Sequence, residues 1–338
     1  MVRERDSKRL RRGRAAALSK PSDDEPFRRG RSRTQILSLV VGLVVLGLAT
    51  WLVARSAPDL RATVSDLGVR AVVVAGLLAL AGTVLIGEVW LVLLRGLGVT
   101  APRAEAARVF FVSQLGKYVP GSVWPVMAQM EFGRRWHAPR RTMLTANALM
   151  IALLPATGLV TGAALLPWSS EGGLGQYWWT LLLLPPLLVL LHPRTIPAVL
   201  DWLFQRLGRK PLNVRASTGS MLVATALGFA IWLVMGLHVM TFVSALGPSG
   251  PVVACAAIGG MGLAWAAGLI FVPAPAGAGV RDAVLVATFA PLIGTTSAFA
   301  VALASRLLLL VADVVLALAG AVTFGHQRKP RYSGSAQQ

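Results

Sequence analysis

Two short segments combine a cation with glycine and proline in otherwise apolar surroundings, and these are the residues best suited to chemistry. The first, residues 115–125, has the sequence LGKYVPGSVWP, and the second, residues 273–282, has the sequence PAPAGAGVRD. Glycine and proline interrupt a helix, which exposes backbone N–H groups and a positive dipole end that suit an anion. Lys117 and Arg281 would add full positive charges. The pattern therefore predicts an anion-binding site in a transporter, where paired broken segments often form the binding site.

The predicted substrate-binding residues come from both segments and from the last apolar stretch. They are Gly116, Lys117, Pro120, Gly121, Gly277, Gly279, Arg281 and Arg306. The alternative is that both breaks are tight turns at the inner membrane interface. The cations would then extend to lipid headgroups.

Three acids are possible charge partners of these cations: Glu88, Asp282 and Asp313. Arg306 and Asp313 are seven residues apart and share one helix face, so they either compensate each other or leave Arg306 facing the cavity. Glu88 could pair with a cation of the site or carry a proton. His238 is expected to be a hydrogen-bonded packing residue rather than a proton relay.

The composition is that of a chain embedded in lipid. Hydrophobic residues make up 55% of the sequence, charged residues only 14%, and the mean hydropathy is +0.65. A soluble domain carries about 25% charged residues. The single cysteine, Cys255, excludes an internal disulfide, and the four histidines are widely spaced. We expect no metal, no cofactor, no nucleic-acid partner and no catalytic residues, so the protein is not expected to be an enzyme.

Apolar stretches long enough to cross a bilayer need about 20 residues. The sequence predicts an all-α polytopic membrane protein with seven full spans, one short segment and two pseudo-related halves. The predicted segments are 36–54, 71–94, 142–168, 172–191, two spans within 216–280 separated by GPSGP at 247–251, the short 283–293, and 296–324.

Basic residues predict the orientation of the chain, because cytoplasmic loops are rich in Lys and Arg. Residues 1–34 hold 12 Lys or Arg and five acids, which indicates a disordered cytoplasmic tail that lies on anionic lipid or acts only as a retention signal. We expect a membrane domain at 35–325, a cytoplasmic tail at 326–338 and location in the plasma membrane. Residues 109–130 have arginines on both flanks and are predicted to be a re-entrant hairpin. An amphipathic helix on the inner surface, or a plain connector, is expected at 196–207.

The segments GKYVPGSVW and PAPAGAGVRD, followed by a last span with an arginine, resemble the lysylphosphatidylglycerol synthase transmembrane domain family over roughly residues 35–325. In that family the second motif is close to P-x-P-G-G-x-G-x-R-E. Gly277, Gly279 and Arg281 match it, whereas Ala276 replaces a glycine and Asp282 replaces the glutamate. The resemblance implies a flippase-like domain that moves an anionic lipid or lipid-linked intermediate between leaflets.

The resemblance does not extend to lysyl transfer, because no charged globular stretch is left for an aminoacyl-transferase domain. Proteins of cell-envelope biosynthesis are possible partners. Two other functions stay open. One is a membrane glycosyltransferase that uses a lipid-phosphate sugar donor and an outer-loop acid, Asp59 or Asp66. The other is a scaffold or regulatory subunit that binds its partner through residues 1–34.

Overall fold

The computed structural model describes residues 67–118, 124–170, 174, 177–212, 215–270 and 279–326. The chain divides into two units, residues 1–44 and 45–338, and all described residues lie in the second. Several predictions concern residues outside the described part: the basic tail, the span at 36–54, both outer-loop acids and the tail beyond residue 326.

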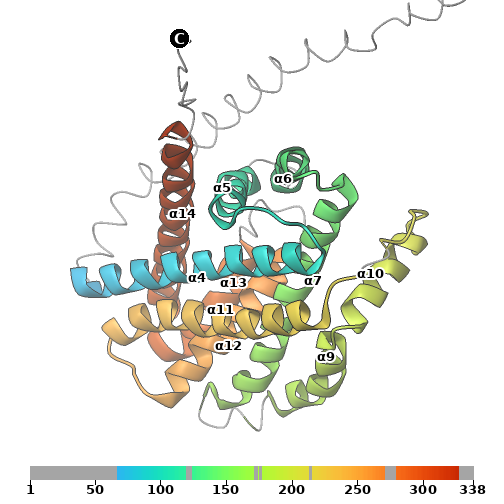
Figure 1. The fold of residues 1–338 in the computed structure, drawn as a ribbon. Coiled ribbons are helices and arrows are strands. Elements are labelled where there is room, and N and C mark those ends of the chain that lie inside the picture. Colours follow the sequence, from blue (N-terminus) through green and yellow to red (C-terminus); the bar gives the residue numbers. More distant parts are fainter. Residues whose placement is uncertain are drawn as a thin grey trace, which may run out of the picture. The chain divides into compact units, whose positions relative to one another are not determined.

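The described residues form helices and no strands (Figure 1), and five of the helices are long and apolar enough to cross a bilayer. They are α4 (Val69–Gly96), α7 (Arg140–Leu165), α11 (Thr218–Ala245), α12 (Pro251–Ile270) and α14 (Thr295–His326). These helices confirm the prediction of an all-α polytopic membrane protein.

A sixth candidate span is bent. The 3-10 helix η4 (Trp178–Leu183) leads into α9 (Leu184–Leu191), and α10 (Thr195–Arg206) follows at an angle of 83°. Two prolines stand at the start of α9, where their missing N–H groups need no helical partner. The predicted amphipathic helix is α10, which buries Ile196 and leaves Trp202 56% exposed.

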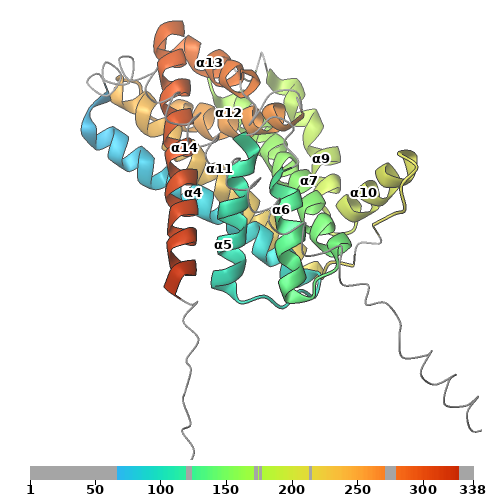
Figure 2. The same cartoon turned by 90° about the horizontal axis from the view of Figure 1, so that it is seen from above.

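A pair of short helices joined by a break occupies the stretch predicted to be a re-entrant hairpin. It consists of α5 (Arg103–Gln114), the 3-10 helix η1 (Leu115–Tyr118) and α6 (Trp124–Gly133). With 12 and 10 residues, α5 and α6 are each too short to cross the hydrocarbon layer alone. They lie side by side (Figures 1 and 2), and Gln129 Nε2 donates to Ser113 Oγ at 2.8 Å between them.

The second broken segment connects α12 to α13 (Val280–Ile293). Helix α13 begins three residues before the predicted short segment at 283–293, because Gly279 starts the helix with φ +85°, a conformation that suits glycine. Gly294, with φ +79°, ends α13 immediately before α14. The predicted break between the last two segments is therefore confirmed.

Small residues bring the long helices close together. Helices α4 and α11 run side by side in Figure 1, and a Cβ on Gly236 of α11 would lie 2.4 Å from the Cα of Ile258 on α12. Helices α7 and α12 meet at Gly158, where a Cβ would lie 2.6 Å from the carbonyl oxygen of Gly262. Lipid tails provide little hydrophobic drive for helix association, so these helices depend on close van der Waals contact.

We expect Gly158→Ala to destabilise the protein by about 1–3 kcal/mol, because the new methyl group meets rigid backbone of α12 rather than a movable side chain. The measurement is the midpoint of thermal unfolding in detergent, followed by tryptophan fluorescence. Gly219→Ala on α11 is the control, since no atom lies within 4 Å of its new methyl group. Equal midpoints for the two variants would contradict this account of the α7–α12 contact.

Candidate functional site

The first broken segment contacts helix α14 through the carboxylate of Asp313. Lys117 Nζ of η1 lies 2.6 Å from Oδ2 of Asp313, and Tyr118 Oη donates to the same oxygen at 2.5 Å. The Asp313 side chain is only 4% exposed, whereas that of Lys117 is 27% exposed. Two donors on one buried oxygen compensate a charge that would be costly at membrane depth.

The second broken segment meets α14 through an ion pair of its own. Arg306 Nη1 of α14 contacts Asp282 Oδ2 of α13. The same carboxylate oxygen accepts a hydrogen bond from the backbone N–H of Gly279 at 3.1 Å. Asp282 therefore lies in the first turn of α13, where a negative charge is stabilised by the helix dipole. This local fold directs the carboxylate towards α14.

Arg281 interacts electrostatically with Asp282, Arg306 and Asp313, so these residues and Lys117 form one charged cluster. Arg281 is the cation of this cluster that forms no salt bridge with a described carboxylate. Its Nη2 lies 3.5 Å from Ser305 Oγ and 3.8 Å from Met261 Sδ, and its guanidinium lies 5.5 Å from the ring centre of Trp265. Its Nε is buried without a hydrogen-bond partner among the described residues, as is the indole nitrogen of Trp265. Residues 119–123 and 271–278, which lie outside the described part, contain no Asp or Glu.

The charges of the cluster do not balance. Lys117, Arg281 and Arg306 contribute three positive charges, and Asp282 and Asp313 contribute two negative ones. The cluster therefore carries one positive charge in excess when all five groups are ionised. Such an arrangement can accept one further anion.

His238 of α11 connects the cluster to the long helices. Its Nδ1 lies 2.8 Å from the carbonyl oxygen of Ala75 on α4, and its Nε2 lies 2.9 Å from Ser305 Oγ. A carbonyl only accepts, so in the neutral ring Nδ1 carries the proton and Nε2 accepts from the Ser305 hydroxyl. The Ser305 oxygen is then free to accept from Arg281. The hydrogen bonds thus run from α4 through α11 and α14 to α13.

The structure brings together most of the predicted site residues that it describes. Lys117, Gly279, Arg281, Asp282, Arg306 and Asp313 all belong to this cluster. Arg306 and Asp313 do not pair with each other: each takes a partner from a different broken segment. Gly116 lies where α5 meets α6, since a Cβ there would be 2.9 Å from Cβ of Trp124. Pro120, Gly121 and Gly277 lie outside the described residues.

Glu88 is not a partner of the three cations. Its Oε2 lies 2.8 Å from Nη2 of Arg103, an exposed residue at the start of α5. The reason is the turn after α4, which folds the chain back so that Arg103 reaches the last turns of α4. The hydrogen bond from Arg103 to Glu88, together with the carboxylate's charge, raises the pKa of the Arg103 guanidinium.

Sequence reasoning missed Ser305, Met261, Trp265 and Tyr118 as neighbours of the cations. Only Tyr118 had a signal, because it directly follows Lys117 within the first broken segment. The contact between Ser305 and His238 joins residues 67 positions apart, so no local pattern could have indicated it.

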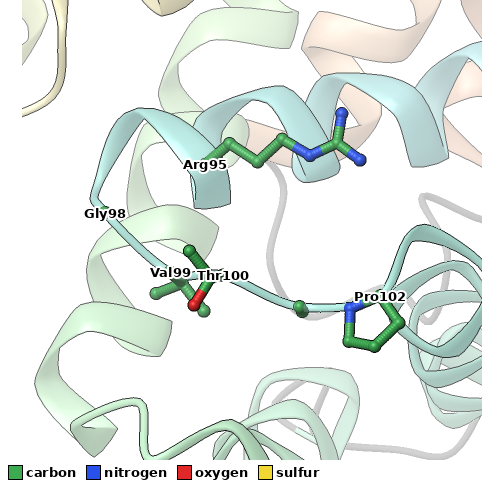
Figure 3. A pocket seen from close by; sticks show the side chains of 6 residues that line it. Arg95, Gly98, Val99, Thr100 and Pro102 are labelled. Carbon is green, nitrogen blue, oxygen red and sulfur yellow. The ribbon is translucent and has the colours of Figure 1, made fainter.

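Other parts of the described structure offer less chemistry. No three of His, Cys, Asp and Glu lie close enough to hold a metal ion in the described part of the chain. A hollow of about 420 Å³ lies between the end of α4 and the start of α5 (Figure 3). Arg95, Gly98, Val99, Thr100, Ala101 and Pro102 line it. Its one cation, Arg95, lies along α4 and points away from Thr100 in Figure 3.

The long apolar helices define a polytopic helical membrane protein, and the described parts of its two broken segments each form an ion pair with α14. The chain belongs to the family described as Lysylphosphatidylglycerol synthase TM region, whose model matches residues 35–317. It is therefore a multi-pass membrane protein of a family related to lipid handling. No curated protein matched the chain.

We expect Asp313→Asn to destabilise the protein by about 2–4 kcal/mol, because Lys117 then lacks its counter-charge in a poorly solvated place. The double variant Lys117→Met, Asp313→Leu should regain most of that stability, since both charges are removed together. The measurement is the thermal unfolding midpoint in detergent. Glu131→Gln is the control and should change little, because Glu131 pairs with Arg134 and Arg140 at an exposed position. Equal losses in the single and double variants would contradict the pairing.

We expect His238→Leu to lower stability by about 1–3 kcal/mol, because the buried Ser305 hydroxyl and its neighbour Arg281 lose an organised partner. Thr241→Ala provides the control on the same helix, since its exposed hydroxyl donates to the backbone carbonyl of Leu237 on α11. Its effect should stay within about 0.5 kcal/mol. The same unfolding measurement applies, and a His238→Leu variant as stable as the control would exclude a structural role for the histidine.

Proposed function

We propose that this protein moves an anionic lipid between the leaflets of the plasma membrane, with the lipid's phosphate held at Arg281. The lipid is a phospholipid or a polyprenyl-phosphate-linked intermediate that cell-envelope biosynthesis proteins make or use. Both chain termini lie in the cytoplasm, and the protein changes the position of the lipid without a chemical reaction. The observation that carries this proposal is that Arg281, in a cluster with one positive charge in excess, forms no salt bridge with a carboxylate of the described residues.

The donors around Arg281 match the chemistry of a phosphodiester. A guanidinium presents several N–H groups in one plane, which suits the oxygens of a phosphate. Its Nε and the Trp265 indole N–H are buried and unpartnered in the described structure, and phosphate oxygens are acceptors only. A phospholipid with a single negative charge would also neutralise the excess positive charge of the cluster.

The two carboxylates of the cluster resemble the ligand in charge. Asp313 pairs with Lys117, and Asp282 pairs with Arg306. A phosphate could bind either cation, so a lipid headgroup competes with these carboxylates. Asp282 belongs to α13 and Asp313 to α14, whereas Lys117 belongs to the hairpin of α5, η1 and α6. Exchange of partners would therefore loosen the hairpin from α14. Movement of one broken segment against the other is how lipid passes in this proposal.

The acyl chains need no aqueous pocket. Phe299 of α14 is 60% exposed and Leu269 at the end of α12 is 40% exposed. Exposed apolar side chains of this kind face lipid in a membrane protein. The headgroup would enter the cluster while its acyl chains stay in the hydrocarbon between helices.

We expect Arg281→Gln to lose the bound anionic lipid that wild-type protein carries from its own membrane. Native mass spectrometry detects the lipid, and proteoliposomes with a fluorescent phosphatidylglycerol detect its transfer between leaflets. Transfer should fall at least about tenfold, because one charge-assisted phosphate contact is worth more than about 1.4 kcal/mol.

Arg103→Gln is the matched control, since it removes an arginine that pairs with a carboxylate outside the cluster. This variant should keep both the lipid and its transfer. If Arg281→Gln retained wild-type lipid and wild-type transfer, the proposed site would be wrong. If wild-type protein neither carried nor transferred an anionic lipid, the proposed function would be wrong.

A further inference from the structure

We propose that the lipid phosphate is bound together with a proton, which is taken up by Asp313, so that anion and proton cross as one neutral pair. This inference rests on the proposed function and adds the co-transported ion. It follows from the way Lys117, Tyr118 and Asp313 share one oxygen.

Two donors compensate the Asp313 carboxylate at its position. Its side chain is 4% exposed, and both the Lys117 ammonium and the Tyr118 hydroxyl contact Oδ2. A carboxylate with so little water around it is stable as an anion only when a cation compensates it. Lys117 is that cation, and its 27% exposure leaves it accessible to a ligand.

A phosphate that binds Lys117 brings a second negative charge next to Asp313. The cluster as a whole has one positive charge in excess, but Asp313 and the phosphate would then compete for the same ammonium in a poorly solvated place. A proton on the carboxylate leaves Lys117 to the phosphate. A carboxylic acid is a much weaker acid than a phosphodiester, so the proton goes to the carboxylate. Asp313 takes one proton from water, and its new hydroxyl can donate to a phosphate oxygen. No bond other than this O–H is formed.

The other charged groups around Asp313 do not replace Lys117. On α13, Arg281 is the proposed phosphate contact itself and lies 3.5 Å from Ser305, and Asp282 holds Arg306 of α14. On α11, His238 is fully buried between a carbonyl and a hydroxyl.

The two remaining helices packed against α14 are α4 and α5. Helix α4 contributes Glu88, which is held by Arg103, and two arginines near its ends, Arg70 and Arg95. Helix α5 contributes Arg108, the backbone of which lies close to Gly320 of α14. Gly320 is seven residues beyond Asp313, so this contact is about two helical turns away.

Asp282 has a backbone donor that Asp313 lacks among the described contacts. It is 21% exposed, and the Gly279 N–H donates to it in addition to Arg306. This backbone donor stays in place when a ligand arrives, and the N-terminus of α13 continues to favour the charged form. Of the two carboxylates, Asp313 therefore loses more of its charge compensation when a phosphate binds its cation.

The experiment is calorimetric titration of the purified full chain with a short-chain phosphatidylglycerol, at one pH in two buffers of different ionisation enthalpy. The difference in heat gives the number of protons taken up per lipid. We expect about one proton for the wild type and nearly none for Asp313→Asn, which should still bind. Correspondingly, the wild-type Kd should rise up to about tenfold for each pH unit.

Glu88→Gln is the matched control, because it removes a carboxylate of a long membrane helix that lies outside the cluster. It should take up as many protons as the wild type. The double variant Lys117→Gln, Asp313→Asn removes both charges of the pair, so it serves where the single variant does not fold. It should bind more weakly, because the phosphate loses its contact with Lys117, and it should bind without proton uptake. A short-chain phosphatidylcholine checks that binding depends on the anionic headgroup.

The possible failures are distinct. Lipid binding by the wild type without proton uptake would overturn this inference and leave the proposed function intact. Unchanged uptake in Asp313→Asn, or its loss in Glu88→Gln, would overturn the assignment to Asp313. No binding of phosphatidylglycerol or of a polyprenyl phosphate by the wild type would overturn the proposed function and this inference with it.

Discussion

Charge compensation at Asp313 holds the tip of a helical hairpin against the last long helix. Lys117 and Tyr118 are both in a 3-10 turn that follows α5, and both reach the same carboxylate oxygen. Apolar packing alone would not hold this tip, because lipid is as good a neighbour for an apolar side chain as another helix is. An unpaired charge at membrane depth is costly, and this cost makes the contact specific. The Arg306–Asp282 pair does the same for α13. Two segments far apart in the sequence thus meet on α14.

The rest of the described structure supports this arrangement. Small residues let α7 and α12 approach to backbone contact at Gly158, and α11 approaches α12 at Gly236. The buried His238 joins α4 and α14 by hydrogen bonds to Ala75 and Ser305. These contacts are fixed by backbone or by buried polar groups, so they provide a firm frame. Against that frame, the ion pairs of the broken segments are the contacts that a charged ligand can exchange.

The sequence predicted the long helices well, because apolar run length is a local property that the bilayer thickness converts directly into a span. Glycine and proline likewise predicted the two breaks, since their effect on the backbone is local. The pairing of charges could not be predicted in this way. Glu88 and Asp313 both lie in apolar helices, yet one meets Arg103 and the other meets Lys117. Helix rotation and the fold of the connecting turns decide between such partners, and neither is encoded within a short window. The link from His238 to Ser305 depends on the same tertiary packing.

The environment of Arg281 argues for a ligand rather than for a structural role. A partly buried arginine that only stabilises the fold would be expected to face a carboxylate, as Arg306 does. Arg281 instead meets a hydroxyl at 3.5 Å, a thioether and an aromatic ring, all weak partners for a full charge. An apolar side chain of similar length would fill the same space without the desolvation cost. The excess charge is therefore unfavourable for the empty protein and favourable once an anion arrives. Such a site binds its ligand because the anion removes the unfavourable energy of the excess positive charge, and release of the ligand restores that unfavourable energy. A transporter needs this balance, because it must let its ligand go on the other side.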